Sequence, residues 1–183
     1  MKTSQPRKVD PRANGWFMLC HPRTQRVVCV SHMLKPERNA IVTAALEKVL
    51  PFYPKCDTFV YDRNCSYAPN QSKRETFQQL KHFPMEAWHG TKHNAGCKYC
   101  TRNVPAYKRR HRGINCSICE STYAWFRNYA RVLNEMGFRR HAFLVFSYVR
   151  RRNDNLSAGD VEYLNAFAPK FSHKRVSKPY RCW

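Results

Sequence analysis

Gly15-Trp-Phe-Met-Leu-Cys20, His21-Pro-Arg-Thr-Gln25 and Arg26-Val-Val-Cys-Val-Ser-His32 form the stretch of sequence that decides the fold. The first segment is a compact apolar run, the second is a polar turn, and the third is rich in β-branched residues. Two such runs joined by a short turn are typical of paired strands. The stretch therefore predicts a β-hairpin at the start of a folded domain.

A helix and another strand are expected after the hairpin. The helix follows Pro36, takes Asn39 as its N-cap and carries an apolar stripe of helical period that stops at Pro51. Residues 58–62 are a short apolar run and predict the next strand. The order strand, strand, helix, strand predicts an α/β domain with a crossover helix.

The rest of the chain alternates between polar loops and apolar segments. A long helix is predicted at 117–136 because the apolar residues of this segment fall on one helical face. The predicted elements are a helical stretch around 72–80, a short strand at 85–89, a loop at 94–115, a long helix at 117–136, an apolar segment at 140–151, a polar break at 152–155, and a capping box at 157–160 that begins a short helix to about 167.

Charge is the most extreme property of the composition. The 183 residues, 43% of them hydrophobic, are enough for one domain with a packed core. They include 33 Lys and Arg against 12 Asp and Glu, which gives a net charge of +21. A folded domain this basic usually meets a polyanion, so nucleic acid is the expected partner and an anionic membrane surface is the alternative.

The expected domain organisation is a single core between two polar ends. Residues 1–14 are predicted to be a disordered basic leader, residues 15–168 the core, and residues 169–183 a basic tail. No secretory signal and no membrane span are expected, because the leader is polar and no apolar run is long enough. Four of the nine cysteines form two Cys-x-x-Cys pairs, so metal binding is expected in place of disulfides, in an intracellular, nuclear protein.

Four cysteines have the spacing of a zinc site within a Cys-rich loop at 94–119. The pattern is Cys97-x2-Cys100-x15-Cys116-x2-Cys119, in which each pair can place two thiolates on one tetrahedral Zn²⁺. The alternative is four reduced cysteines without a ligand.

His89 and His93, at positions i and i+4, are candidate ligands of the same metal or of a second metal. Alternatively, His89 packs within the domain and His93 contacts a phosphate.

Two carboxylates are candidates for a catalytic divalent metal. Asp62 ends the predicted strand at 58–62, and Glu120 lies at the start of the long helix. Mg²⁺ or Mn²⁺ takes hard oxygen ligands that converge from separate elements, and such ions support phosphodiester cleavage. The alternative is structural: Asp62 caps the next turn, and Glu120 is an acid favoured by the helix dipole.

The loop that follows the histidines combines cations with aromatic rings. Trp88, Tyr99 and Tyr107 are candidates to stack on exposed bases. The cations predicted to contact nucleic acid are Lys92, Lys98, Arg102, Lys108, Arg109, Arg110 and Arg112.

Four stretches of the chain carry a family resemblance. They are Phe59-Val-Tyr-Asp-Arg-Asn-Cys65, Trp88-His-Gly-Thr-Lys-His-Asn-Ala-Gly-Cys97, residues 115–130 and residues 139–153. In order and character they resemble the catalytic core of Kyakuja-Dileera-Zisupton (KDZ) transposases, which have an RNase H-like fold. The resemblance implies metal-dependent DNA strand cleavage and transfer, with Asp62 as the second catalytic acid and Glu120 as the third. His89, His93 and Cys97 match the family's His/Cys stretch.

One departure from the family bears on activity. The first catalytic acid belongs to the first strand of an RNase H-like sheet, whereas the two hairpin strands correspond to the second and third. Asp10, in a polar stretch flanked by prolines, is the one nearby candidate.

The expectation is therefore an α/β domain with an incomplete RNase H-like mixed sheet, flanking helices and a Cys/His-rich insertion. It would be a transposase-derived, DNA-binding and catalytically inactive fragment. The alternative is a zinc-stabilised nucleic-acid-binding module without catalytic activity. Homo-oligomerisation through Trp125, Phe126 and Tyr129 is a third hypothesis, although such a stripe is more often core.

Overall fold

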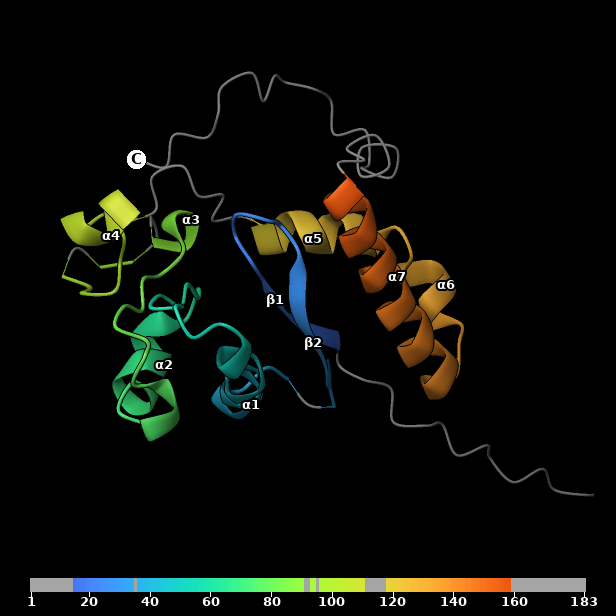
Figure 1. Cartoon of the computed structure of the whole chain (residues 1–183), viewed down its shortest axis with the longest axis horizontal. Coiled ribbons are helices and arrows are strands. Elements are labelled where there is room, and N and C mark those ends of the chain that lie inside the picture. Colours follow the sequence, from blue (N-terminus) through green and yellow to red (C-terminus); the bar gives the residue numbers. More distant parts are fainter. Residues whose placement is uncertain (1–14, 35, 91–92, 95, 111–117, 159–183) are drawn as a thin grey trace, which may run out of the picture.

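A two-stranded antiparallel sheet lies at the centre of the molecule (Figure 1). The computed structural model describes residues 15–34, 36–90, 93–94, 96–110 and 118–158, with the backbone alone for residues 88, 110 and 158. Strand β1 (Gly15–Cys20) pairs with β2 (Val27–Met33), Gly15 lying opposite Met33 and Cys20 opposite Val27. The predicted hairpin is therefore confirmed.

Helices lie around the hairpin and make up about half of the described chain. The hairpin and the helices together confirm the expected α/β class and are compatible with an incomplete RNase H-like fold. The helices are α1 (Asn39–Val49), α2 (Asn64–Gln71), α3 (Ala87–Gly90), α4 (Pro105–Arg110), α5 (Ile118–Arg127), α6 (Ala130–Asn134) and α7 (Phe138–Ala158), with 3-10 turns at Leu50–Phe52 and Glu75–Phe77.

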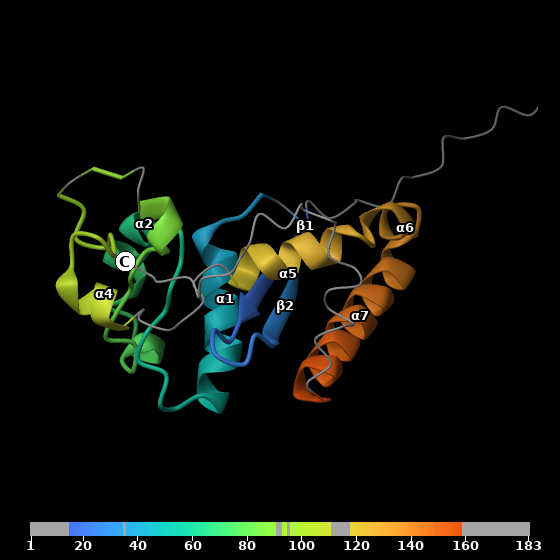
Figure 2. The same cartoon turned by 90° about the horizontal axis from the view of Figure 1, so that it is seen from above.

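Both faces of the hairpin are buried, because strand residues alternate between two hydrophobic cores. Phe17 belongs to one core with residues of α1, α2 and the loops that follow them. Trp16 and Met18 belong to the other, with residues of α5, α6 and α7. Figures 1 and 2 show α1 and α2 on one side of the strands and α7 on the other. Burial on both faces explains why β1 is apolar along most of its length.

Helix α7 is tied to the hairpin by polar side chains. Asn153 accepts a hydrogen bond from the Val27 N–H at 2.9 Å and donates to the Val27 carbonyl at 2.8 Å. The buried Arg152 donates to the Gln25 carbonyl at 2.7 Å. The polar break predicted at 152–155 is therefore wrong, since these polar residues continue the helix and face the hairpin turn.

The predicted strand at 58–62 is also wrong. Thr58 forms an isolated parallel bridge with His82, and the backbone N–H groups of Phe59 and Tyr61 donate to His82 and Pro84. Pro84 has no N–H group, so it cannot return a hydrogen bond and extend the ladder. The segment is extended but does not join the hairpin sheet, and the crossover topology is not formed in the described residues.

Several element boundaries differ from the prediction. Asn39 is the first residue of α1, whose N-cap is Arg38, while the helix ends before Pro51 as predicted. The predicted helix around 72–80 is reduced to the 3-10 turn at Glu75–Phe77, α2 lies just before it, and the predicted strand at 85–89 is replaced by α3. The expected loop at 94–115 contains α4.

The long helix predicted at 117–136 is divided into α5 and α6. Between them, the N–H groups of Asn128 and Tyr129 bond to carbonyls three residues earlier, which tightens the backbone. Trp125, Phe126 and Leu133 all belong to the second core, so the apolar stripe is mainly core.

At the other end of α7, Ser157 lies within the helix, and the capping-box acid and the helix predicted beyond it lie outside the described residues. None of the helices described is long and apolar enough to cross a membrane.

Candidate metal centre

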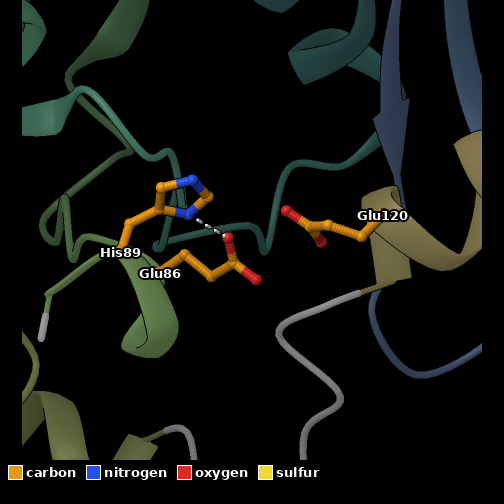
Figure 3. Close-up of side chains that lie close together, drawn as sticks. All are labelled: Glu86, His89 and Glu120. Atoms are coloured by element: carbon orange, nitrogen blue, oxygen red, sulfur yellow. Dashed lines mark hydrogen bonds and ion pairs between the residues drawn. The ribbon is translucent and has the colours of Figure 1, made fainter.

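Three metal-ligating side chains come together from two separate elements. Glu86 precedes α3, His89 lies within it, and Glu120 is in the first turn of α5. One ligand atom of each residue lies within 4.8 Å of the other two. Figure 3 shows the Glu86 and His89 side chains next to each other, with Glu120 directed toward them from α5.

The backbone around Glu86 is fixed by its neighbours. The N–H group of Met85 donates to the Tyr99 carbonyl at 2.7 Å, and the Thr101 hydroxyl donates to the Met85 carbonyl at 2.6 Å. The Gly90 N–H group donates a hydrogen bond to the Glu86 carbonyl, which completes the turn of α3. A Cβ at Gly90 would lie 2.8 Å from the Cys100 Sγ, so glycine permits the close approach of this turn to Cys100.

The geometry of the turn pairs Glu86 with His89. Residues three apart on a helical turn lie on the same face, and His89 Nδ1 is 2.6 Å from a Glu86 carboxylate oxygen. The Glu86 side chain is 7% exposed, whereas that of His89 is 33% exposed. The pair therefore has one side in the protein interior and the other toward solvent.

Glu86 ionises less readily than an ordinary glutamate. Burial raises the pKa of its carboxyl group, and the hydrogen bond and negative charge of Glu120 raise it further, while His89 acts in the opposite direction. Two carboxylates that face each other in a partly buried site repel when both are charged. A bound cation would remove that repulsion.

The side chains of Glu86, His89 and Glu120 are suitable ligands for a divalent cation. Two carboxylates and an imidazole suit Mn²⁺ and Zn²⁺, and Mg²⁺ also takes carboxylate oxygens. Glu86 and His89 would hold the ion from α3 and Glu120 from α5. A cation bound here would polarise a phosphoryl oxygen and lower the pKa of a bound water.

Glu86 and Glu120, but not His89, form part of the lining of a cavity of about 290 Å³ whose wall is mostly apolar. Glu37 and Asp62 line it too. No Lys or Arg is found among the described residues of the lining, although the chain has 33 of them against 12 acids. A cavity lined by four carboxylates in such a basic chain favours cations over anions.

Asp62 shares this cavity with Glu120 but lies outside the three-residue group. The fully buried Asn64 fixes its loop by donating to the Phe59 carbonyl at 2.9 Å and the Pro84 carbonyl at 2.8 Å. One Asp62 carboxylate oxygen is buried and has no hydrogen-bond partner in the described structure. An uncompensated buried carboxylate oxygen of this kind also favours a nearby cation.

Glu86 is the residue that the sequence did not reveal. The sequence places Glu86 in the strand predicted at 85–89, and neighbouring side chains of a strand point to opposite faces. The helical turn instead brings Glu86 and His89 together. The signal that could have found it is the spacing Glu86-x-x-His89, which is meaningful only if the segment is helical.

The described cysteines of the predicted zinc site each have contacts within the protein. Cys97 and Cys100 lie on one turn, and the Cys100 thiol donates to the Gly90 carbonyl. Cys119 is hydrogen-bonded to Cys20 of β1, which raises the pKa of Cys119 and lowers that of Cys20.

Of the other predicted zinc ligands, Cys116 lies outside the described residues, and His93, on the loop after α3, is not part of the three-residue group. The four-cysteine zinc site stays a prediction.

The described cations of the predicted nucleic-acid site lie around α4. Lys98, Arg102, Lys108 and Arg109 are exposed. The Arg102 guanidinium donates to the His93 carbonyl, and the Lys98 ammonium lies 5.4 Å from the centre of the Tyr99 ring. Lys92, Arg112 and the side chain of Arg110 lie outside the described residues, as does the side chain of Trp88.

Fold and site define an α/β domain with an acidic candidate metal centre in a strongly basic chain. A model of the Kyakuja-Dileera-Zisupton (KDZ) transposase family matches residues 7–153, which is most of the chain. The chain belongs to this family, which confirms the resemblance seen in the sequence. Neither a search of curated proteins nor a search of solved structures found a match.

Proposed function

We propose that this transposase-family chain acts in the nucleus as a DNA-binding protein with a divalent cation held by Glu86, His89 and Glu120. The observation that carries the proposal is the convergence of Glu86, His89 and Glu120, of which the two glutamates line a cavity without Lys or Arg among its described lining residues. Asp62, in the same cavity, is proposed as a further acidic ligand. Membership of a transposase family supports DNA as the polyanion that the net charge of +21 favours as a partner.

The DNA contact is proposed at the surface around α4, which we call the basic lobe. It consists of Lys98, Arg102, Lys108 and Arg109. Figure 1 shows α4 near α3, which carries His89, and the thiol of Cys100, before α4, donates to the Gly90 carbonyl at the end of α3. DNA bound to these cations would therefore lie near the candidate metal centre.

Removing the basic lobe is expected to weaken DNA binding. The variant Lys98→Ala/Lys108→Ala/Arg109→Ala should bind a 20-base-pair duplex at least about 10-fold more weakly, because each lost phosphate contact removes counterion release. Its slope of log affinity against log salt should decrease in magnitude by about 2 to 3. Fluorescence anisotropy between 50 and 200 mM salt measures both quantities.

A charge-matched variant controls for the loss of net charge. Lys48, Lys55 and Lys73 are exposed and lie on α1 or in the loops after α1 and α2. Their triple alanine variant removes the same charge and should bind duplex much more tightly than the basic-lobe variant. Equal losses in the two variants would show that binding depends on overall charge and not on the basic lobe.

We also propose that this chain does not cleave DNA by itself. Two-metal cleavage of a phosphodiester needs carboxylates that hold both ions, whereas the three convergent ligands suit a single ion. Incubation of supercoiled plasmid with the protein and Mg²⁺ or Mn²⁺ should therefore give no more nicking than the Glu120→Gln variant gives. Metal-dependent nicking that disappears in Glu120→Gln would overturn this proposal.

A further inference from the structure

Helix α7 carries a ridge of exposed side chains on the face opposite its buried one. Arg139, Phe143, Phe146 and Arg150 follow one another at intervals of four, three and four residues, so they share one face of the helix. Val145 and Val149, on the other face, are buried in the second core. We call these four residues the Arg-Phe ridge.

The two phenylalanines of the ridge are open to solvent. Phe143 is 70% exposed and Phe146 is 52% exposed. Phe146 also contacts the edge of Trp16, with ring centres 6.0 Å apart, which holds its ring on the helix surface. An exposed aromatic pair between two cations is a surface suited to a partner that offers both flat rings and negative charge.

The charge pattern opposes pairing with a second copy of the chain. Arg139 and Arg150 each lie four residues from the nearer phenylalanine, and Arg150 also forms an exposed ion pair with Asp154 on the next turn, at 3.9 Å. If two ridges met in antiparallel fashion about their centres, each Arg139 would face an Arg150, and in parallel fashion like residues would face each other. Both arrangements place like charges together in a partly desolvated contact, which is unfavourable.

We infer that the Arg-Phe ridge binds single-stranded DNA. Phenylalanine rings stack on unpaired bases, whose faces are hidden in a duplex, and the flanking arginines pair with phosphates. This inference rests on the proposed function, since it assumes that DNA is the partner, and adds a second contact specific for single strands. Figures 1 and 2 show α7 and α4 at opposite ends of the molecule, so the ridge is separate from the basic lobe.

The test compares two probes of equal length, labelled dT20 and a 20-base-pair duplex, by fluorescence anisotropy at 100 mM salt. Phe143→Ala/Phe146→Ala is expected to lower affinity for dT20 by about 10-fold or more, because base stacking is lost. Affinity for the duplex should stay within about 2-fold of wild type. Val132→Ala is the matched control, since Val132 is an exposed apolar residue of α6 outside the ridge.

A second pair of variants separates stacking from plain apolar contact. Phe143→Leu keeps an apolar side chain but has no aromatic face, and Phe143→Trp enlarges that face. Weaker dT20 binding by the leucine variant, with wild-type or tighter binding by the tryptophan variant, supports the inference. Thermal unfolding is expected to be unchanged in both variants because Phe143 is largely exposed.

Three results would overturn the inference. The first is that the ridge variants bind dT20 as tightly as the wild type does. If duplex binding also persists, the proposed function would remain intact. The second is wild-type self-association, measured by light scattering, that is lost in Phe143→Ala. The third is equal ridge-dependent binding of poly-glutamate, which would indicate an acidic protein partner. Failure of the wild type to bind either DNA probe would instead contradict the proposed function.

Discussion

Glu120→Gln and Glu86→Gln are each expected to reduce the affinity of the protein for Mn²⁺ by about 100-fold, because each removes one of three convergent ligands. Glutamine keeps the size of the side chain but supplies no negative charge. Without Glu120 the ion would be held from the α3 side alone, and without Glu86 it would keep one carboxylate and the imidazole. Isothermal titration calorimetry with Mn²⁺ measures the affinity directly.

The same cavity provides the control. Glu37 lines it but lies outside the three-residue group, and its carboxylate accepts a hydrogen bond from the Tyr61 hydroxyl. Glu37→Gln removes the same charge and can still accept that bond, so its effect on affinity should be below about 10-fold. Mn²⁺ affinity in Glu120→Gln equal to that in Glu37→Gln would show that the cavity attracts cations without coordinating them at Glu120.

Asp62→Asn tests the further ligand that the family resemblance implied. The buried, unpartnered Asp62 oxygen predicts a loss of Mn²⁺ affinity intermediate between those of Glu37→Gln and Glu120→Gln. A loss as large as that of Glu120→Gln would place Asp62 in direct contact with the ion. An affinity no lower than that of Glu37→Gln would give Asp62 a structural role only.

Asn64→Ala is expected to reduce the free energy of unfolding by about 3 to 5 kcal/mol. The fully buried Asn64 amide donates to two carbonyls, those of Phe59 and Pro84. Alanine would remove the side-chain donor from the Phe59 carbonyl, would leave the Pro84 carbonyl with the Tyr61 N–H, and would create a small cavity. Chemical unfolding followed by circular dichroism measures the change.

The position of Asn64 makes this effect functional as well as structural. Its two hydrogen bonds join the loop that carries Asp62 to the segment just before Glu86, so the variant should also bind Mn²⁺ more weakly. Asn70 of the same helix is exposed and provides the control, since Asn70→Ala should change stability by less than about 0.5 kcal/mol. A loss below about 1 kcal/mol in Asn64→Ala would mean that water replaces the two hydrogen bonds.

The parts of the fold that the sequence predicted are those with a strong local pattern. The hairpin follows from two runs of residues 15–32, and α1 follows from an apolar stripe that stops at Pro51. The carboxylates of Asp62 and Glu120 were found because each lies next to an apolar segment. Both line the same cavity, which no local pattern required.

The errors arose where distant residues change the meaning of a local pattern. Residues 58–62 have the composition of a strand, but the segment that pairs with them contains Pro84, which limits the pairing to a single bridge. Arg152 and Asn153 have the composition of a loop, but they continue α7 because the hairpin backbone supplies their hydrogen bonds. A polar residue in a sequence does not reveal whether its partner is water or a strand far along the chain.

The sequence by itself determined the charge, the hairpin, the KDZ resemblance and two of the cavity carboxylates. Only the tertiary structure decided that Glu86 joins His89 and Glu120, that Cys119 meets Cys20, and that α7 presents an exposed ridge. The reason is physical. Periodicity follows from backbone geometry within a few residues, whereas a ligand set depends on the packing of α3 against α5, which are far apart in the chain.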